Sequence, residues 1–416
     1  MRKRYVSQLW LLGWLLFGVA TGPATAATSP ALQALAQSFL AEHPAAQAAQ
    51  ADLERAEAEA RALGQALYNP ELEFEYEDST DTTKSVGMSQ TFDWNGKRRA
   101  RDRASGESLR AASAALAAAR QELLAELLEK LSSVKVTAEA AGLSKQRVDL
   151  LKEFVTLAER RYAAGDVGQS DVDLAHLALS EASMQSATLL SDAAEAESHL
   201  AALFQRSMSS WPALPALPLD ASAYADNTLL DRHPILRRAA AEAAAAKANV
   251  SIAQRDSRPD PTLGLHGGRE DDDTLLRLSV SIPLFVRNTY RAEVDAANAE
   301  ALRAEQVYRN KLQRARGELQ AATKRYQSTR SALQDWENSG QHRLKGRIAL
   351  LKQLWEAGEV GTTEYLVQLQ QTLDTQISAA TLRAAVWEAW IRWLSASGQI
   401  EYWLGTQTDP ASRMKR

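Results

Sequence analysis

Cysteine is absent from this chain of 416 residues. Disulfide bonds, thiolate metal sites and cysteine nucleophiles are therefore excluded. A lipid-modified N-terminal cysteine is excluded for the same reason. We expect the mature protein to hold to any membrane through its polypeptide alone, without a lipid anchor.

Three other absences narrow the class of protein. No stretch beyond the N-terminus reaches the roughly 18 consecutive apolar residues that a membrane-spanning helix requires. The formal net charge is only −4, which argues against a nucleic-acid partner. There is no Gly-rich phosphate loop and no nucleophile elbow, and the six histidines are scattered. We therefore expect neither an enzyme nor a bound cofactor.

The N-terminal residues have the pattern of a secretory signal. A basic start at 2–4 precedes an apolar run at 9–20, and 24–26 fits a small-x-small cleavage site. We predict a signal peptide over 1–26, which implies export across the inner membrane of a bacterium. The alternative is a single N-terminal membrane helix, but the apolar run is short of the roughly 20 residues that such a helix needs.

An internal duplication is the strongest positive signal. His43-Pro44 recurs as His233-Pro234, and the segment 161–168 resembles 354–361. This pattern predicts a first structural repeat over 27–208, a Pro-rich linker over 209–226, a second repeat over 227–404 and a C-terminal tail over 405–416. The linker is either a featureless connection or an ordered strap against the helices, and Trp211 with the neighbouring leucines favours the strap.

Alanine-rich composition with helical spacing predicts unusually long helices. We expect helices over about 30–67, 97–162 and 290–355, each of the last two roughly 100 Å long if continuous. Globular domains do not hold helices of that length, which suit a structure that crosses a wide gap. The stripe formed by Trp387, Trp390, Ile391 and Leu394 is expected to be core packing.

Two predicted hairpins, 71–93 and 262–284, alternate apolar and polar residues. Alternation over about nine residues is typical of transmembrane β-barrels, although a soluble hairpin with one wet face has the same period. Strands in a membrane must close, and four are too few because the smallest such barrels have eight. Two copies would supply eight strands and three would supply twelve, and only the larger barrel leaves an aqueous bore.

Several short motifs, taken together, resemble the TolC-like outer membrane efflux proteins. They are the duplication, Asn69-Pro70-Glu71-Leu72 at the first strand, the run 89–99 at the exit of the second strand, 281–288 in the second half and the two Gly turns at 163–169 and 356–362. The resemblance covers essentially the whole mature chain. The motifs at 69–72 and 89–99 look most like the heavy-metal efflux branch.

The resemblance implies a mainly α fold with a small membrane β-barrel portion. Three copies would build a long α-helical periplasmic barrel and a twelve-stranded β-barrel in outer membrane lipid, with four strands from each chain. It implies a passive exit duct that works with a periplasmic adaptor and an inner-membrane transporter, expected to be proton-driven and of the RND type. Multidrug efflux and type I protein secretion are the alternatives within this class. A structural coiled-coil protein of the periplasm is the alternative from another class.

The two Gly turns are the main candidate sites. Gly165 and Gly358 allow the positive φ at which a helix ends and reverses, and Ser170 with Asp173, or Thr363, can cap the returning helices. By resemblance, adaptor docking at the periplasmic tip is assigned to Tyr162, Gly165, Val167, Gly168, Trp355, Gly358, Val360 and Gly361. By resemblance again, the candidate gate comprises Arg160, Arg161, Asp171, Asp173, Glu364 and Gln368. A solvated helix face is the alternative for these charges.

The strands supply a second set of candidates. The polar face predicts a barrel lumen lined by Glu71, Glu73, Glu75, Glu77 and Arg277. These acids would attract cations in general, but the lack of histidine pairs at ligand spacing argues against a specific metal site. Trp94 is expected either in a membrane-interface girdle or packed against a neighbouring chain.

Overall fold

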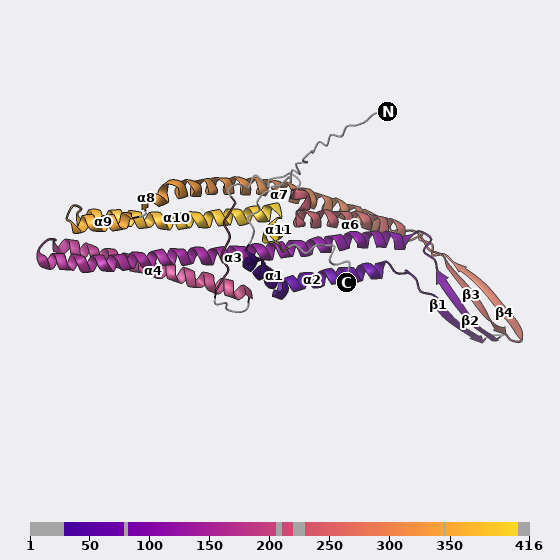
Figure 1. Ribbon diagram of the computed structural model, residues 1–416. Coiled ribbons are helices and arrows are strands. Elements are labelled where there is room, and N and C mark those ends of the chain that lie inside the picture. The colour runs from indigo at the N-terminus through magenta and orange to yellow at the C-terminus, as the bar shows by residue number, and fades with distance from the viewer. Residues whose placement is uncertain (1–28, 79–81, 205–209, 219–228, 345, 407–416) are drawn as a thin grey trace, which may run out of the picture.

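A computed structural model describes residues 29–78, 82–204, 210–218, 229–344 and 346–406. The predicted signal peptide over 1–26 lies outside these residues, as do most of the tail and both ends of the linker. The molecule is a long helical bundle with a small β-sheet at one end (Figure 1). Among the described residues, none of the helices has a stretch both long and apolar enough to cross a membrane.

Each half of the chain contributes helices, a hairpin and then more helices. The first half comprises α1 (Pro30–Glu42), α2 (Pro44–Leu63), β1 (Glu71–Asp78), β2 (Thr82–Thr91), α3 (Lys97–Ala164) and α4 (Gln169–Phe204). The second half comprises α5 (Leu229–Arg232), α6 (Pro234–Asp256), β3 (Thr262–Glu270), β4 (Asp273–Ser281), α7 (Arg291–Asp335), the π-helical turn η2 (Trp336–Gly340), α8 (Gln341–Leu344), α9 (Arg347–Glu356), α10 (Thr362–Ser397) and α11 (Ile400–Leu404).

The predicted single helix over 30–67 is wrong, because the chain breaks at His43. Pro44 disfavours a helical conformation at the residue before it, and His43 is extended with φ −72° and ψ 126°. The imidazole Nδ1 of His43 accepts the backbone N–H of Ala45 and so caps the new helix. His233 does the same before α6, where its Nδ1 accepts the N–H of Ile235 at 3.3 Å. Both His-Pro pairs are therefore helix starts.

The two long helices differ more than the duplication predicts. α3 runs unbroken for 68 residues, about 100 Å, and passes straight through Gly106 and Gly142. The predicted continuous helix over 290–355 is wrong, because it is divided into α7, η2, α8 and α9. In η2 the ring of Trp336 lies where a Cβ on residue 340 would stand, so only glycine fits there. Gly346, with φ +78°, then begins α9.

The four strands form one antiparallel sheet in the order β1-β2-β3-β4 (Figure 1). The hairpins of the two halves therefore lie side by side, with Gly87 of β2 opposite His266 of β3. The outer edges of β1 and β4 have no partner strand among the residues that the structure describes. Because an open edge exposes backbone donors and acceptors, the sheet is incomplete as it stands.

One face of the sheet is apolar and exposed. Three cross-strand rows carry it: Leu72 to Met88 to Leu265 to Leu278, Phe74 to Val86 to Gly267 to Leu276, and Gln90 to Leu263 to Val280. Phe74, Leu276 and Leu278 are each 75% exposed. No helix among the described residues covers this band, and a contiguous exposed apolar surface marks a site of contact with another protein or with a membrane.

The main core lies midway along the bundle. Leu124, Leu127 and Leu128 of α3 are fully buried, and the rings of Trp390 and Trp393 stack 5.1 Å apart. The stripe that includes Trp387, Trp390, Ile391 and Leu394 belongs to this core, as predicted. Residues 210–218 follow it as an ordered strap: Leu214 is buried, Trp211 packs on Phe204, and Tyr326 donates its hydroxyl to the carbonyl of Pro218. The strap interpretation is confirmed for these residues.

A buried ionic cluster joins the sheet to the helices. The Nζ of Lys97, at the start of α3, lies 3.0 Å from Oδ2 of Asp260, and both side chains are over nine-tenths buried. Tyr68 and Asn95 also donate hydrogen bonds to this carboxylate. Burial alone would raise the pKa of Asp260, but the hydrogen bonds from Lys97, Tyr68 and Asn95 lower it. Burial and the Asp260 contact raise the pKa of Tyr68 to about 12.

Candidate functional site

Both Gly turns lie together at the end of the bundle opposite the sheet (Figure 1). α3 ends at Gly165, which has φ +84°, and the N–H of Asp166 returns to the carbonyl of Arg161 at 2.9 Å. After α9, Gly358 has φ +76° and the N–H of Glu359 returns to the carbonyl of Leu354 at 2.9 Å. These paired backbone bonds are the same helix-ending motif, which requires a left-handed residue.

The returning helices begin in different ways. At α4, Oδ2 of Asp171 accepts the N–H of Gly168 at 3.0 Å, which is one half of a capping box. The expected caps from Ser170 and Asp173 do not form, since Asp173 instead accepts from the side chain of Gln169. At α10 the cap residue is Gly361, with no side-chain cap, so Thr363 does not cap this helix either.

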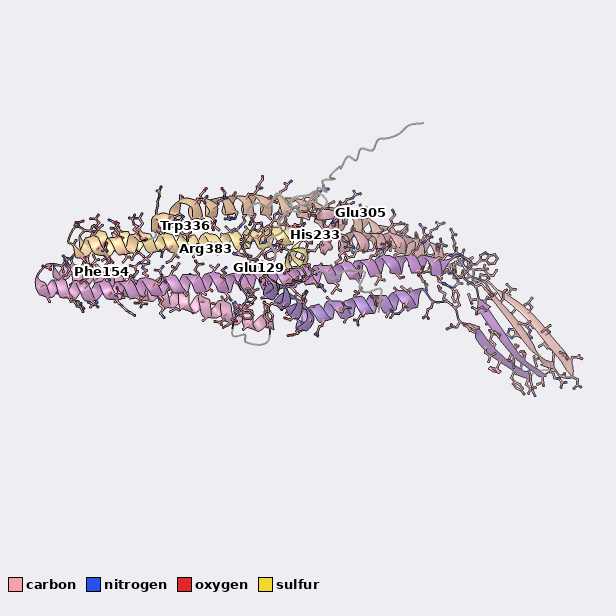
Figure 2. All side chains as sticks on the ribbon, viewed as in Figure 1. Glu129, Phe154, His233, Glu305, Trp336 and Arg383 are labelled. Atoms are coloured by element: carbon pink, nitrogen blue, oxygen red, sulfur yellow. The ribbon has the colours of Figure 1, made fainter. Side chains whose placement is uncertain are left out.

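A buried aromatic cluster underlies the tip of the second half. The ring of Phe154, labelled near the end of the bundle in Figure 2, lies 4.6 Å from those of Trp355 and Tyr365. Trp355 is only 1% exposed and donates its indole N–H to Oγ1 of Thr362 at 3.4 Å. Burial, with the nearby charges of Glu153 and Glu356, raises the pKa of Tyr365 to about 12. The predicted tip residue Trp355 therefore packs inside the bundle, and Val360 packs partly against the same cluster.

Arg161 connects the two tips. Its Nη1 donates to the carbonyl of Trp355 at 2.8 Å, and its guanidinium lies 4.8 Å from the indole centroid. The cation–π geometry and the hydrogen bond hold the end of α3 against the end of α9. Among the described residues, Arg161 pairs with no carboxylate.

The other predicted gate residues do not gather into one cluster of ion pairs in this chain. Gln368 donates to Glu364 at 3.0 Å along α10, and its Oε1 accepts from Arg347 at 3.4 Å. Arg160 and Asp173 are exposed, whereas Asp171 on α4 is half-buried. Tyr162 and the turn residues Gly168 and Gly361 are exposed at the tip, and Val167 is half-buried. Their roles in docking and gating stay predictions.

Three ion pairs between α3 and the tip-side helices α9 and α10 were not predicted. Glu139 pairs with Arg383, Arg147 with Asp374 at 3.2 Å, and Glu153 with Lys352 at 3.0 Å. They join α3 to α10 and α9 at intervals along the bundle. Figure 2 shows Arg383 between the middle of the bundle and the end that carries the Gly turns. The hydrogen bond and charge of Glu153 raise the pKa of Lys352. No sequence motif marks these pairs, because the pairing depends on which helix faces meet.

The opposite face of the sheet carries the predicted lumen residues. The parity of the register places Glu71, Glu73, Glu75 and Glu77 on one face with Arg277. Arg277 donates to Glu75 at 2.9 Å, and Ser85 and Ser89 donate to Glu75 and Glu73. Trp94, which follows β2, is 78% exposed. Its ring is therefore accessible both to a membrane interface and to a neighbouring chain, and both roles stay predictions.

His266 lies on this polar face without a full set of partners. Its Nε2 is 3.6 Å from a carboxylate oxygen of Glu73, and its Nδ1 is buried with no hydrogen-bond partner. The ring covers Gly87, where a Cβ would collide with it. Within the residues that the structure describes, no group of three or more histidine and carboxylate side chains is placed to hold a metal ion.

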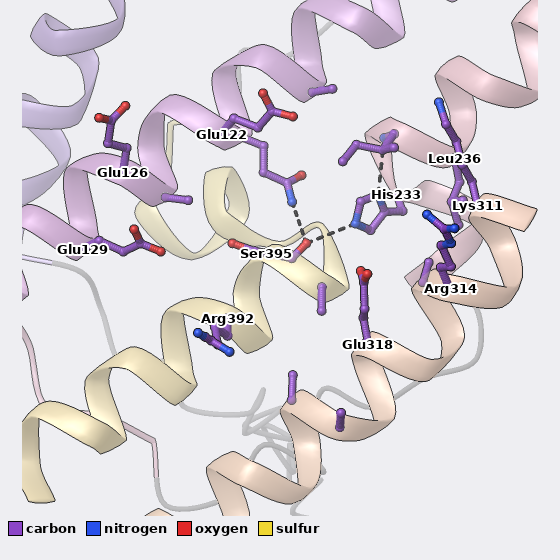
Figure 3. A pocket seen from close by; sticks show the side chains of 18 of the residues that line it. Glu122, Glu126, Glu129, His233, Leu236, Lys311, Arg314, Glu318, Arg392 and Ser395 are labelled. Carbon is purple, nitrogen blue, oxygen red and sulfur yellow. Dashed lines mark hydrogen bonds between the residues drawn. The ribbon is translucent and has the colours of Figure 1, made fainter.

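A charged cavity of about 1040 Å³ opens midway along the bundle, between α3, α6, α7 and α10 (Figure 3). Glu122, Glu126 and Glu129 line it from α3, and Lys311 and Arg314 from α7. Figure 3 also shows His233 turned toward Ser395. The Nε2 of His233 donates to the carbonyl of Ser395 at 3.1 Å, because Nδ1 already accepts from Ile235. Burial lowers the pKa of His233, opposed by this hydrogen bond.

Comparisons with known proteins identify a matching family and similar individual proteins. The profile of the outer membrane efflux protein family matches residues 35–204 and 227–399. The cobalt-zinc-cadmium resistance protein CzcC of Cupriavidus metallidurans is 26% identical over 233 residues, which are 53% of this chain and 55% of that protein. The nickel-cobalt-cadmium resistance protein NccC of Alcaligenes xylosoxydans xylosoxydans is 27% identical over 305 residues, 69% of this chain and 68% of that one. The match thus spans only about half the length of CzcC.

Solved structures match over a larger share of the chain. The CmeC outer membrane channel of Campylobacter jejuni superposes with a TM-score of 0.75 at 16% identity, covering 93% of this chain and 89% of that one. Likeness at this level of identity concerns the fold. It extends to the arrangement of a helical bundle with a four-stranded sheet at one end.

Proposed function

Because the chain belongs to the outer membrane efflux protein family, we propose that three copies form the exit duct of a tripartite efflux pump. The four-stranded sheet carries the proposal, with its exposed apolar face and two open edges. Open edges cannot face lipid, so this sheet enters a membrane only by pairing β4 of one copy with β1 of the next. Three copies supply twelve strands, enough for an aqueous bore.

The duct is passive in this proposal. An inner-membrane transporter, proton-driven and of the RND type, supplies the energy, and a periplasmic adaptor docks at the tips built around Gly165 and Gly358. The bundle suits that task because α3 alone spans about 100 Å, which bridges a wide aqueous gap. A structural coiled-coil protein of the periplasm would need no apolar sheet face, so the sheet favours the duct.

Heavy-metal cations are the proposed cargo. The relatives CzcC and NccC carry metal resistance in their names. The polar face of the sheet supports the same assignment, because four glutamates line one strand and attract cations without a tight site. Multidrug efflux and type I secretion remain the alternatives, which a different cargo would reveal.

The experiment has two stages. The full chain, expressed in a bacterium with an outer membrane, should fractionate with that membrane and migrate in detergent as a trimer that heating converts to monomer. A soluble periplasmic monomer would overturn the duct. Deletion of the coding sequence, followed by a panel of cobalt, zinc, cadmium and nickel salts and of drugs, then identifies the cargo. Sensitivity to drugs alone would overturn the metal assignment and leave the duct intact.

A further inference from the structure

A hollow interrupts the apolar face of the sheet near the hairpin tips. It measures about 630 Å³ and is lined on this face by Phe74, Tyr76, Lys84, Val86, Gly267 and Arg269. Gly267 creates it, since no atom lies within 4 Å of the position that a Cβ would occupy there. The neighbours of Gly267 in the register are Val86 and Leu276, so the gap lies within the apolar band.

Two cations stand at the rim of the hollow. Lys84 and Arg269 are direct cross-strand partners in β2 and β3, and both are exposed. Among the described residues, neither forms an ion pair or a hydrogen bond; Lys84 only lies over the ring of Tyr76, 5.7 Å from its centroid. Two like charges directly opposite each other destabilise a sheet, so this arrangement favours a bound anion.

Their depth follows from the register. The apolar band begins at the row of Gln90 and Leu263, near the helices. Lys84 precedes Gln90 by six residues in β2 and so lies about 20 Å away, toward the hairpin turn. The apolar belt of a transmembrane barrel is about 25 Å tall. Lys84 and Arg269 therefore stand at the end of the belt remote from the periplasmic helices, where the outer leaflet has its headgroups.

No neighbouring copy is expected over this site. β2 and β3 are the two central strands, so a trimer that joins β4 to β1 leaves their apolar face toward lipid. We propose that Lys84 and Arg269 bind the phosphates of a phosphorylated glycolipid of the outer leaflet, such as lipid A, with one acyl chain lying in the hollow over Gly267. The inference rests on the proposed function, because it takes this face of the sheet to be the lipid-facing face of an outer membrane barrel.

The test uses the purified full-length trimer and diphosphoryl lipid A, measured by native mass spectrometry in detergent. We expect the Lys84→Gln/Arg269→Gln variant to bind lipid A at least tenfold more weakly than the wild type. The charge-preserving Lys84→Arg/Arg269→Lys variant should bind nearly as the wild type does. Gly267→Leu, which fills the hollow without changing charge, should also weaken binding. The matched control is Arg316→Gln/Lys324→Gln, an equal loss of charge on exposed positions of α7.

Three results would overturn the inference. One is equal binding of lipid A by the wild type and the double glutamine variant. The second is displacement of bound lipid A by inorganic phosphate as effective as displacement by added lipid A, which would indicate a site for free anions. The third is equally tight binding of phosphatidylglycerol, which would remove the outer-leaflet assignment. Trimer migration and single-channel conductance of the wild type are recorded in parallel, so that failure of the duct itself is seen separately.

Discussion

At the scale of single residues, the chain places its few buried charges where elements meet. Lys97 and Asp260 join the start of α3 to the approach to β3, and His233 joins the start of α6 to the end of α10. The sequence marked His233-Pro234 as the second copy of a repeated pair, but it could not identify the partner of Lys97, because Asp260 lies 163 positions away and only the fold brings the two together.

The buried ion pair supports a stability prediction. Lys97→Met leaves the Asp260 carboxylate buried without its cation, which should reduce the free energy of unfolding by about 3–5 kcal/mol. Thermal unfolding of the purified trimer measures the change. The double variant Lys97→Met/Asp260→Leu removes both charges and should recover most of the loss. A single variant as stable as the wild type would show that the pair contributes nothing.

His233 supports a prediction on pH. Its folded-state pKa is lowered from 6.5 by burial, so the neutral ring is favoured by folding. Its stabilising contribution is therefore fully present above about pH 6.5 and is lost as pH falls through the lower folded-state value. Protonation also adds a proton to Nδ1, which then no longer accepts from Ile235.

The measurement is the unfolding temperature of the trimer between about pH 7.5 and about pH 4.5. His233→Asn keeps a capping acceptor but does not titrate, so it should flatten the acid side of the profile. His43→Asn, the same change at the equivalent cap of the first half, is the matched control. An unchanged acid slope in the His233 variant would contradict the assignment.

At the scale of elements, periodicity predicted the types of helix and strand well and their continuity less well. The break at His43 was available from Pro44 and was overlooked because apolar spacing continues through it. The turn at Trp336–Gly340 had no comparable signal, since it contains no proline and a π-helical turn is defined by its backbone hydrogen bonds rather than by a residue type. The cross-repeat ion pairs were out of reach because a repeat does not say which faces of its two copies meet.

The tip turns carry a prediction at this scale. Gly358→Pro/Asp171→Ala changes a position with φ +76° to a residue fixed near −65° and removes the cap on Gly168. We expect loss of adaptor binding or altered gating with the trimer intact, measured by adaptor pull-down, conductance and trimer migration. Gly142→Ala, in the middle of α3 with no atom near its Cβ, is the neutral control. Normal adaptor binding together with normal transport would remove the tip from the mechanism.

At the scale of the whole molecule, the sheet decides how the chain meets a membrane. Leu278 belongs to the apolar face and its neighbour Ser279 to the polar face. Leu278→Arg should therefore cost about 2–4 kcal/mol at the lipid face and reduce insertion of the trimer, whereas Ser279→Arg, one residue away, should be tolerated in the lumen. Outer membrane fractionation of both variants measures this. The reverse ranking would mean that the faces are assigned the wrong way round.

The open edges of the sheet also have a genetic consequence. Because the barrel wall is shared among three chains, one non-conducting subunit impairs the whole barrel. A subunit that folds and pairs but cannot conduct will enter barrels made by normal subunits. With equal expression of the two, only about one barrel in eight is built entirely from normal chains. Variants that spare β1 and β4 but block the bore should therefore be dominant, and variants that abolish pairing of these edges should be recessive.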